Sequence, residues 1–368
     1  MQRQPASRLL YLDGLRGVAI TLVMLFHAYA RWPRVVPYSN QFAGFPLFAN
    51  GWLGVELFFL IPGFVIYMTL EQCETLGEFF WRRWTRLFPA MLVCSLIIFL
   101  TLPLFPQRPA GTRSYIDILP GITFIDPAWW NWAGVQVLAL DGAFWSIFVE
   151  VKFYIAFGLL YFIAGGAAAV ASMFGLSLLH VADILAGGIP YVHQLADNAN
   201  TLFGSYFAGW FAAGALYYRY WQQKEVRLLV LAIGIASSIV VTIPPQSRLA
   251  AGMIVTLFTA AVVFESAQRL FANRAVVFVG FISYPLYLLH QNIMIALTVD
   301  IAYVLPRVPL GLTPIPAVVP IAGVAWLVAA VIEPKAIMAL RRSSVDAGAM
   351  ARRPVASFRG IAKRARNP

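Results

Sequence analysis

The stretch Trp52–Leu70 reads WLGVELFFLIPGFVIYMTL and decides the fold class. It contains 19 residues and a single charged side chain, Glu56. About 20 consecutive, mostly apolar residues are needed for an α-helix to cross the hydrocarbon core of a bilayer. The stretch therefore predicts a transmembrane helix that carries one carboxyl group.

Comparable apolar runs recur along the whole chain, separated by short polar breaks. Of the 368 residues, 60% are hydrophobic and 12% are charged, whereas about 25% are charged in a typical soluble domain. We therefore expect an all-α polytopic membrane protein, a single bundle of about ten transmembrane helices. The predicted spans are residues 13–30, 52–70, 87–105, 143–163, 165–183, 202–220, 228–243, 249–265, 276–298 and 314–333.

The distribution of positive charge predicts the orientation. With the amino terminus in the cytoplasm, 19 of the 27 Lys and Arg residues fall on the cytoplasmic side, six fall on the opposite side, and Arg16 and Lys152 lie within spans. Cytoplasmic segments are enriched in Lys and Arg, so we expect both termini to be cytoplasmic. Residues 1–333 then form the membrane-embedded domain. Residues 334–368 form a basic, disordered tail, which suits anionic lipid rather than nucleic acid.

The amino-terminal residues also allow a second interpretation. Arg3 and Arg8, followed by the apolar run Gly17–Phe26 and small residues, are similar to a cleavable signal peptide. Asp13 and Arg16 interrupt that layout, so an uncleaved first span is the preferred prediction.

Ionisable side chains inside a span are costly, and each is therefore a candidate functional group. Arg16 and His27 are eleven residues apart, which places them on one helix face and about 16 Å apart along the axis. Asp13 lies one turn before Arg16 and can partner it. A neutral imidazole suits a general base near neutral pH, so His27 is a candidate catalytic residue. The alternative is a histidine that only packs or hydrogen-bonds.

The segment Phe79–Pro89, FFWRRWTRLFP, lies at the start of the third span. Arg83 and Arg86 are three residues apart and share a helix face. Guanidinium groups bind phosphate in a bidentate manner, so Arg83 and Arg86, together with Arg16, are candidate donor-binding residues. The alternative is that they only signal topology.

The fourth span contains a polar stripe. Ser146, Glu150 and Tyr154 recur every four residues and line one helix face. A carboxylate that faced lipid would be expensive, so Glu150 and Glu56 should face the bundle interior. Glu150 is a candidate catalytic residue and Glu56 a candidate cavity-lining residue. The alternative for both is a structural link between helices.

The ninth span carries Tyr287 and His290 on one face, beside the helix-kinking Pro285. Both are candidate cavity-lining residues, whereas His180 and His193 lack comparable context and are expected to be structural. The two cysteines match neither a metal-ligand spacing nor a disulfide framework. We expect no metal site and no permanently bound cofactor.

These segments together resemble acyltransferase family 3, integral-membrane acyltransferases that modify extracytoplasmic glycans and related acceptors. Five pieces match in family order and cover residues 12 to 333. They are Leu12–Gly17 with His27, Gly54–Phe59, Arg82–Arg86, Trp145–Glu150 and Ile282–His290. One departure is that the family usually has Ser-Gly-Phe where this chain has Pro62-Gly63-Phe64.

The resemblance implies a function for the donor-binding and catalytic candidates. A cytoplasmic acyl-coenzyme A (acyl-CoA) would place its phosphates on Arg83 and Arg86, with Arg16 nearby, and its thioester close to His27. His27 would then deprotonate a hydroxyl of an extracytoplasmic carbohydrate or lipid-linked sugar, or take the acyl group itself as a covalent relay.

The same resemblance assigns the remaining groups and the location. Glu150 would orient His27 or balance its charge, Tyr287 and His290 would line the same cavity, and the bacterial inner membrane would be the location. Two alternatives stay open. A secondary transporter also buries His, Glu and Arg, and a non-catalytic membrane subunit of an acylation system would tolerate Pro62.

Overall fold

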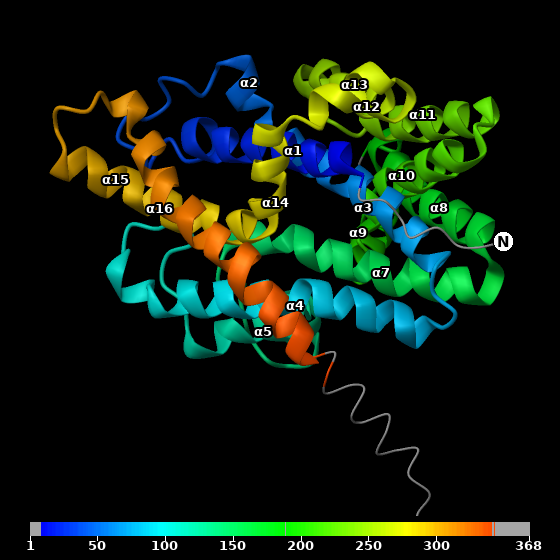
Figure 1. Ribbon diagram of the computed structural model, residues 1–368, viewed down its shortest axis with the longest axis horizontal. Helices are drawn as coiled ribbons and strands as arrows, with labels where there is room; N and C mark the ends of the chain where they lie inside the picture. Colours follow the sequence, from blue (N-terminus) through cyan, green and yellow to red (C-terminus); the bar gives the residue numbers. More distant parts are fainter. Residues whose placement is uncertain (1–8, 188, 341, 343–368) are drawn as a thin grey trace, which may run out of the picture.

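The computed structural model describes residues 9–187, 189–340 and 342, and these residues contain helices and no β-strand. The longer helices lie side by side along the long axis of the molecule (Figure 1). The α-helices are α1 (Leu10–Phe26), α2 (Pro46–Ala49), α3 (Gly54–Leu70), α4 (Leu76–Leu100), α5 (Leu119–Thr123), α6 (Pro127–Trp132), α7 (Trp145–Ala164), α8 (Gly166–Leu185), α9 (Pro190–Phe203), α10 (Ser205–Gln223), α11 (Val226–Val240), α12 (Arg248–Val263), α13 (Glu265–Phe271), α14 (Arg274–Leu289), α15 (Ile295–Val304) and α16 (Pro314–Leu327).

Shorter helical turns connect or extend these helices. Three are π-helical turns that directly follow α1, α14 and α16, namely His27–Arg31, His290–Met294 and Val328–Ile332. The others are 3-10 turns at Gly51–Leu53, Leu102–Leu104, Tyr115–Ile118, Gly142–Phe144, Pro245–Ser247 and Leu310–Leu312. A π-helical turn is rare and is often found at a functional site.

The helices confirm an all-α polytopic membrane protein. Eight helical runs in the described residues are long and apolar enough to cross a membrane. They are Leu10–Arg31, Gly51–Leu70, Leu76–Leu100, Gly142–Ala164, Gly166–Leu185, Pro245–Val263, Arg274–Val304 and Leu310–Leu340. The other two predicted spans are occupied by α10 and by α11, which has only 15 residues. The count of ten spans therefore stays a prediction.

The bundle has two ends, which we name from α1. The proximal face is the end at which α1 begins at Leu10, and the distal face is the end at which the run ends at Arg31. Before α3, the chain at Gly51 packs against Leu22 in the distal half of α1. Helix α3 therefore runs back toward the proximal face, and α4 runs in the opposite direction with α7 packed against both (Figure 1).

Helices α1 and α14 run parallel and touch through glycines. A Cβ atom on Gly17 would lie 2.2 Å from the carbonyl oxygen of Val276 in α14, and one on Gly14 would lie 1.8 Å from that of Phe271 at the end of α13. A Cβ atom on Gly280 would lie 1.7 Å from the carbonyl oxygen of Asp13. Small residues allow such close approach of helix backbones in membranes. This contact brings the distal ends of α1 and α14 together.

The third span was predicted at residues 87–105, but the helix that forms it, α4, begins and ends earlier in the sequence. Helix α4 begins at Leu76, because the Thr75 side chain caps it by accepting from the Glu78 amide at 3.1 Å. The Glu78 carboxylate in turn accepts from the Glu74 amide at 2.9 Å. Reciprocal capping of this kind stabilises a helix start. The arginine-rich segment therefore lies inside the helix rather than before it.

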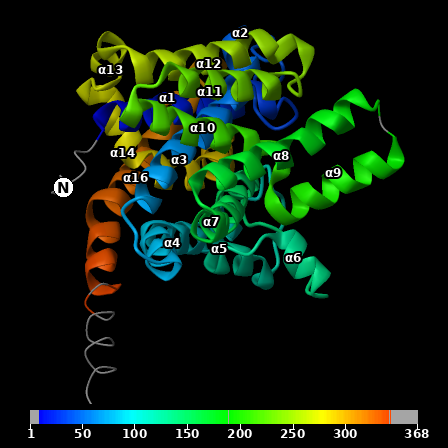
Figure 2. The ribbon, with the colours of Figure 1, turned by 90° about the vertical axis from the view of Figure 1, so that its right-hand side faces the viewer.

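Helix α9 was not predicted and forms a hairpin with α8 that projects from the bundle (Figure 2). His193 of α9 lies 3.1 Å from the Asp183 carboxylate, and this hydrogen bond raises the pKa of His193. His180 stacks on Tyr206, with ring centroids 3.8 Å apart. These contacts account for both histidines as structural groups.

Two predictions concern residues at the chain ends. The last helical run continues to Leu340, past the predicted domain boundary at residue 333. The rest of the predicted tail, residue 341 and residues 343–368, lies outside the described residues, as do Arg3 and Arg8 of the signal-peptide interpretation.

We predict that Gly17→Ala destabilises the bundle by about 1–3 kcal/mol, because the new Cβ must displace a helix backbone rather than a side chain. Gly234→Ala is the matched control, since a Cβ atom there meets nothing within 4 Å. It should be neutral or stabilising by up to roughly 1 kcal/mol. Thermal unfolding in detergent would measure both variants, and equal melting temperatures would contradict the role of the glycine contact.

Candidate active site

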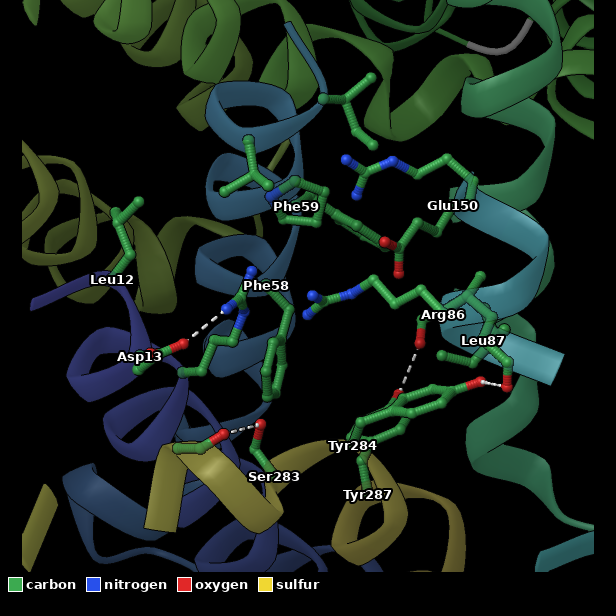
Figure 3. A pocket seen from close by; sticks show the side chains of 18 of the residues that line it. Leu12, Asp13, Phe58, Phe59, Arg86, Leu87, Glu150, Ser283, Tyr284 and Tyr287 are labelled. Carbon is green, nitrogen blue, oxygen red and sulfur yellow. Dashed lines mark hydrogen bonds and ion pairs between the residues drawn. The ribbon is translucent and has the colours of Figure 1, made fainter. Parts of the chain in front are cut away.

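A cavity of about 500 Å³ lies between α1, α3, α4, α7, α14 and the end of the last helical run. Its lining extends from Leu9 and Met68 near the proximal face to Ser146 and Tyr287 at its deep end. Figure 3 shows this cavity, with polar side chains entering it from several helices. The elements that form it are the same ones that carried the sequence motifs.

Three guanidinium groups line the cavity, and each has a different environment. Arg16 of α1 forms an ion pair with Asp13 at 2.8 Å. Arg83 of α4 is buried and donates to the Thr69 hydroxyl of α3, while its Nε has no hydrogen-bond partner among the described residues. Arg86 is exposed. The structure thus places all three predicted donor-binding residues on one cavity and leaves Arg86 the most accessible.

Glu150 faces these arginines. It accepts a hydrogen bond from the Tyr154 hydroxyl and interacts electrostatically with Arg86, Arg16 and Arg83. Figure 3 shows the Glu150 and Arg86 side chains entering the cavity near each other. The groups that interact with Glu150 are thus the arginines and Tyr154. Its expected role of orienting His27 or balancing its charge stays a prediction.

Two aromatic rings close the deep end of the cavity. The Tyr287 ring packs edge-on against Phe58 of α3, with centroids 5.6 Å apart. The Tyr287 hydroxyl accepts a hydrogen bond from Ser146 of α7 at 2.8 Å. On its other side, Tyr287 lies 5.3 Å from the His290 ring, centroid to centroid. One layer of aromatic side chains therefore separates the cavity from His290.

His27 and His290 form a pair beyond this layer. Nδ1 of His27 lies 3.1 Å from Nε2 of His290, and the ring centroids are 4.8 Å apart. His290 is fully buried and His27 is half-buried. Each histidine begins a π-helical turn. The sequence singled out both residues, but it did not predict that they touch.

Hydrogen bonding assigns the tautomers of the pair. His290 Nδ1 lies 2.7 Å from the Tyr287 carbonyl oxygen, which can only accept, so Nδ1 carries the proton and Nε2 accepts. The facing atom, His27 Nδ1, must then be the donor, and it also lies 3.0 Å from the Val23 carbonyl oxygen. The lone pair of neutral His27 is consequently on Nε2. His290 thus holds His27 in the tautomer of a base.

Two cavity-lining predictions do not match the lining. In the described part of the chain, the cavity contacts Tyr287 but neither His290 nor Glu56. Glu56 is buried near the start of α3, and its Oε2 atom has no hydrogen-bond partner among the described residues. Its position follows from α3 packing its first turns against α1, whereas Phe58 and Pro62 face the cavity.

Sequence analysis missed Glu333, which lines the cavity from the last helical run and interacts electrostatically with Arg86. A carboxyl group at the end of an apolar span was the available signal. Pro62 lies in the cavity wall, so the departure from the family pattern is at the site. No group of three His, Cys, Asp or Glu side chains suited to a metal ion occurs in the described ranges.

Comparison with known proteins agrees with this architecture. A family profile described as an acyltransferase domain matches residues 9–333. The chain belongs to acyltransferase family 3. The matched range contains every candidate residue, from Arg16 on α1 to Glu333.

Individual relatives are distant. A Staphylococcus aureus (strain COL) protein named "Putative O-acetyltransferase SACOL0978" is 24% identical over 314 residues, which cover 76% of this chain and 49% of that protein. O-acetyltransferase OatA of Staphylococcus aureus (strain NCTC 8325 / PS 47) is 28% identical over 162 residues, 40% of this chain and 24% of OatA. The chain thus spans about half the length of the first relative and about a quarter of the second. No solved structure matches the chain.

We predict that His27 carries its proton on Nδ1 and its lone pair on Nε2. Nitrogen-15 NMR of histidine-labelled protein in micelles would distinguish the protonated from the unprotonated nitrogen. His290→Ala should leave this tautomer in place, because the Val23 carbonyl oxygen still accepts from Nδ1 at 3.0 Å. A wild-type signal from a protonated Nε2 would contradict the assignment.

Proposed function

We propose that this protein transfers an acyl group from acyl-CoA to a hydroxyl of an extracytoplasmic carbohydrate or lipid-linked sugar. The observation that carries the proposal is the histidine pair, which presents a basic nitrogen just beyond the closed end of an arginine-lined cavity. A general base and an anion site at opposite ends of one route are what transfer from a phosphorylated donor requires.

The proximal face is the donor side in this proposal. Arg86, Arg83 and Arg16 give the cavity three positive groups, offset in part by Asp13 and Glu150. Phosphate is recognised well by guanidinium forks. The excess of Lys and Arg in proximal segments supports a cytoplasmic proximal face, with both termini in the cytoplasm of a bacterium and the acceptor on the distal side.

The chemistry follows from the tautomer of His27. Nε2 takes the proton of the acceptor hydroxyl while its oxygen attacks the thioester carbonyl carbon. The carbon–oxygen bond forms, the carbon–sulfur bond breaks, and the proton passes from His27 to the departing coenzyme A thiolate. The same lone pair supports a second route, in which Nε2 first takes the acyl group and then passes it to the acceptor.

His290 acts through His27 in either route. Its Nε2 accepts the Nδ1 proton and so stabilises positive charge that develops on the His27 ring. This arrangement parallels the nucleophile–base–orienting group logic of hydrolytic triads, with an imidazole as the orienting group. No cofactor is needed for the transfer, because the donor supplies the activated acyl group.

The first test replaces the base. His27→Ala should lower acyl transfer from acetyl-CoA by roughly 100- to 10,000-fold, because a positioned general base contributes about that factor. His193→Ala is the control, since His193 is exposed on α9 and lies outside the cavity lining. Transfer would be measured with purified protein in liposomes and a sugar acceptor. Wild-type turnover in His27→Ala would refute the role of His27, and a wild type inactive on every thioester would refute the function.

The second test concerns donor binding. Arg86→Ala should raise the dissociation constant of coenzyme A roughly 10- to 150-fold, since a hydrogen bond to a charged group contributes about 1.5–3 kcal/mol. Arg86→Lys should recover only part of this loss, because it cannot form the bidentate fork.

Arg82→Ala is the matched control for this measurement. Arg82 is on the same helix but pairs with Glu78 at 2.5 Å and is outside the cavity lining. Titration calorimetry would give the three affinities. Equal affinities in the Arg86 and Arg82 variants would reduce Arg86 to a topology signal.

A further inference from the structure

A polar clamp holds the π-helical turn that begins at His290. The clamp consists of Asp141, which precedes α7, and Asn292, the third residue of the turn. Both side chains are fully buried. Neither lines the donor cavity in the described ranges. Both residues escape the motifs that identified the site.

The π-helical register explains why a clamp is needed here. In a π-helix the carbonyl of one residue faces the amide of the residue five positions later. Here the Tyr287 carbonyl therefore faces the Asn292 amide. The Tyr287 carbonyl accepts from the His290 ring at 2.7 Å, and the Asn292 amide donates to Asp141 Oδ2 at 3.1 Å. The two side chains therefore satisfy the two backbone groups that face each other across the turn.

Asp141 links this turn to the start of α7. Its Oδ1 atom accepts from the Ala143 amide at 2.8 Å while Oδ2 accepts from Asn292. Burial raises the pKa of Asp141 to about 6, with the two amides and the more distant Arg113 and Arg108 opposing that rise. A buried carboxylate is expensive without an ion pair, and the described residues form none with Asp141, whereas a serine or asparagine would suffice for a helix cap. The second contact, to Asn292, gives a reason for the carboxylate.

Asn292 also holds the distal segment, the connection between α4 and α7 (residues 101–144), over the same turn. Its Nδ2 atom donates to the Leu140 carbonyl oxygen at 3.1 Å, and its Oδ1 atom accepts from the Ala110 amide at 3.0 Å. Asn292 is therefore bonded through its backbone and both ends of its side chain. Asn292 and Asp141 together join three parts of the chain: the turn that begins at His290, the residues before α7, and the loop around Ala110.

We propose that Asp141 and Asn292 are positioning residues that hold the His290 ring against His27. The expected effect on turnover rests on the proposed function. The effect on the position of His290 can be measured without any activity. Neither residue touches the reacting atoms. Their effect passes through the π-helical turn to His290, and through the hydrogen bond of His290 to the base.

Asp117 offers a matched control. It is a buried aspartate in the same distal segment, and its carboxylate also accepts from two backbone amides, Ser114 at 2.7 Å and Leu138 at 2.8 Å. Among the described residues, the hydrogen bonds of its carboxylate do not reach the turn at His290. Asp117→Asn therefore removes the same chemistry from the same segment and leaves the histidine pair in place.

The experiment compares Asp141→Asn, Asn292→Ala and Asp117→Asn in full-length protein in liposomes. The first two should lower turnover from acetyl-CoA roughly 10- to 100-fold, as expected for small misplacement of a catalytic group. Their Michaelis constant for acetyl-CoA should not change, because the donor cavity lies on the other side of Tyr287. Asp117→Asn should retain turnover within about twofold once thermal unfolding shows that it is folded.

A second readout is the rate at which diethyl pyrocarbonate modifies His290, resolved by peptide mass spectrometry with exposed His193 as the internal reference. Opening the clamp should make buried His290 react faster in Asp141→Asn and Asn292→Ala than in Asp117→Asn. Equal modification in all three variants would overturn the inference, whether or not the protein transfers an acyl group. Faster modification with no thioester turnover in the wild type would support the clamp and refute the proposed function.

Discussion

The close contact between α1 and α14 is the constraint on which the site depends. At Gly17 and Gly280 the two backbones approach so closely that no Cβ atom fits. Because the helices run parallel, their distal ends then meet, and His27 and His290 face each other at 3.1 Å. A side chain at either glycine would meet the backbone of the facing helix and push the two helices apart.

Burial of charge sets the character of the cavity below this contact. Three arginines from two helices would repel one another in a medium of low dielectric constant unless opposite charge were near. Asp13, Glu150 and Glu333 supply that charge, each from a different helix. The cavity is consequently polar but close to balanced, and Arg86 is the cation with the least internal pairing.

The sequence predicted the helical fold and which residues would lie at the site, because both depend on local pattern. Apolar runs gave the spans, and spacing of three, four and eleven residues placed polar groups on common helix faces. The pairing of residues distant in sequence was not accessible in this way. His27 and His290 are separated by 263 positions, and helical periodicity says nothing about which helices are neighbours.

Other differences from the sequence predictions have local causes. The start of α4 was displaced because Thr75 and Glu78 cap a helix whose first turns are charged rather than apolar. Helix α9 is amphipathic, and all but its last two residues lie between two predicted spans. Asp141 was missed because it lies at the end of an apolar run, where a polar residue is ordinary, and Asn292 because it lies within the ninth predicted span without matching a motif. Only the π-helical turn between them gives them a specific role.

Tyr287 connects the two halves of the site through different atoms. Its ring and hydroxyl close the cavity against Phe58 and Ser146, whereas its backbone carbonyl accepts from His290 and fixes the tautomer of the base. Rotation of the side chain would open a path for the thioester without moving that carbonyl, because rotation about χ1 leaves the backbone in place. In the transfer that we propose, the Phe58 and Tyr287 rings would otherwise lie between a donor in the cavity and the histidine pair. Separation of these two tasks within one residue lets the base stay prepared while access to it is controlled.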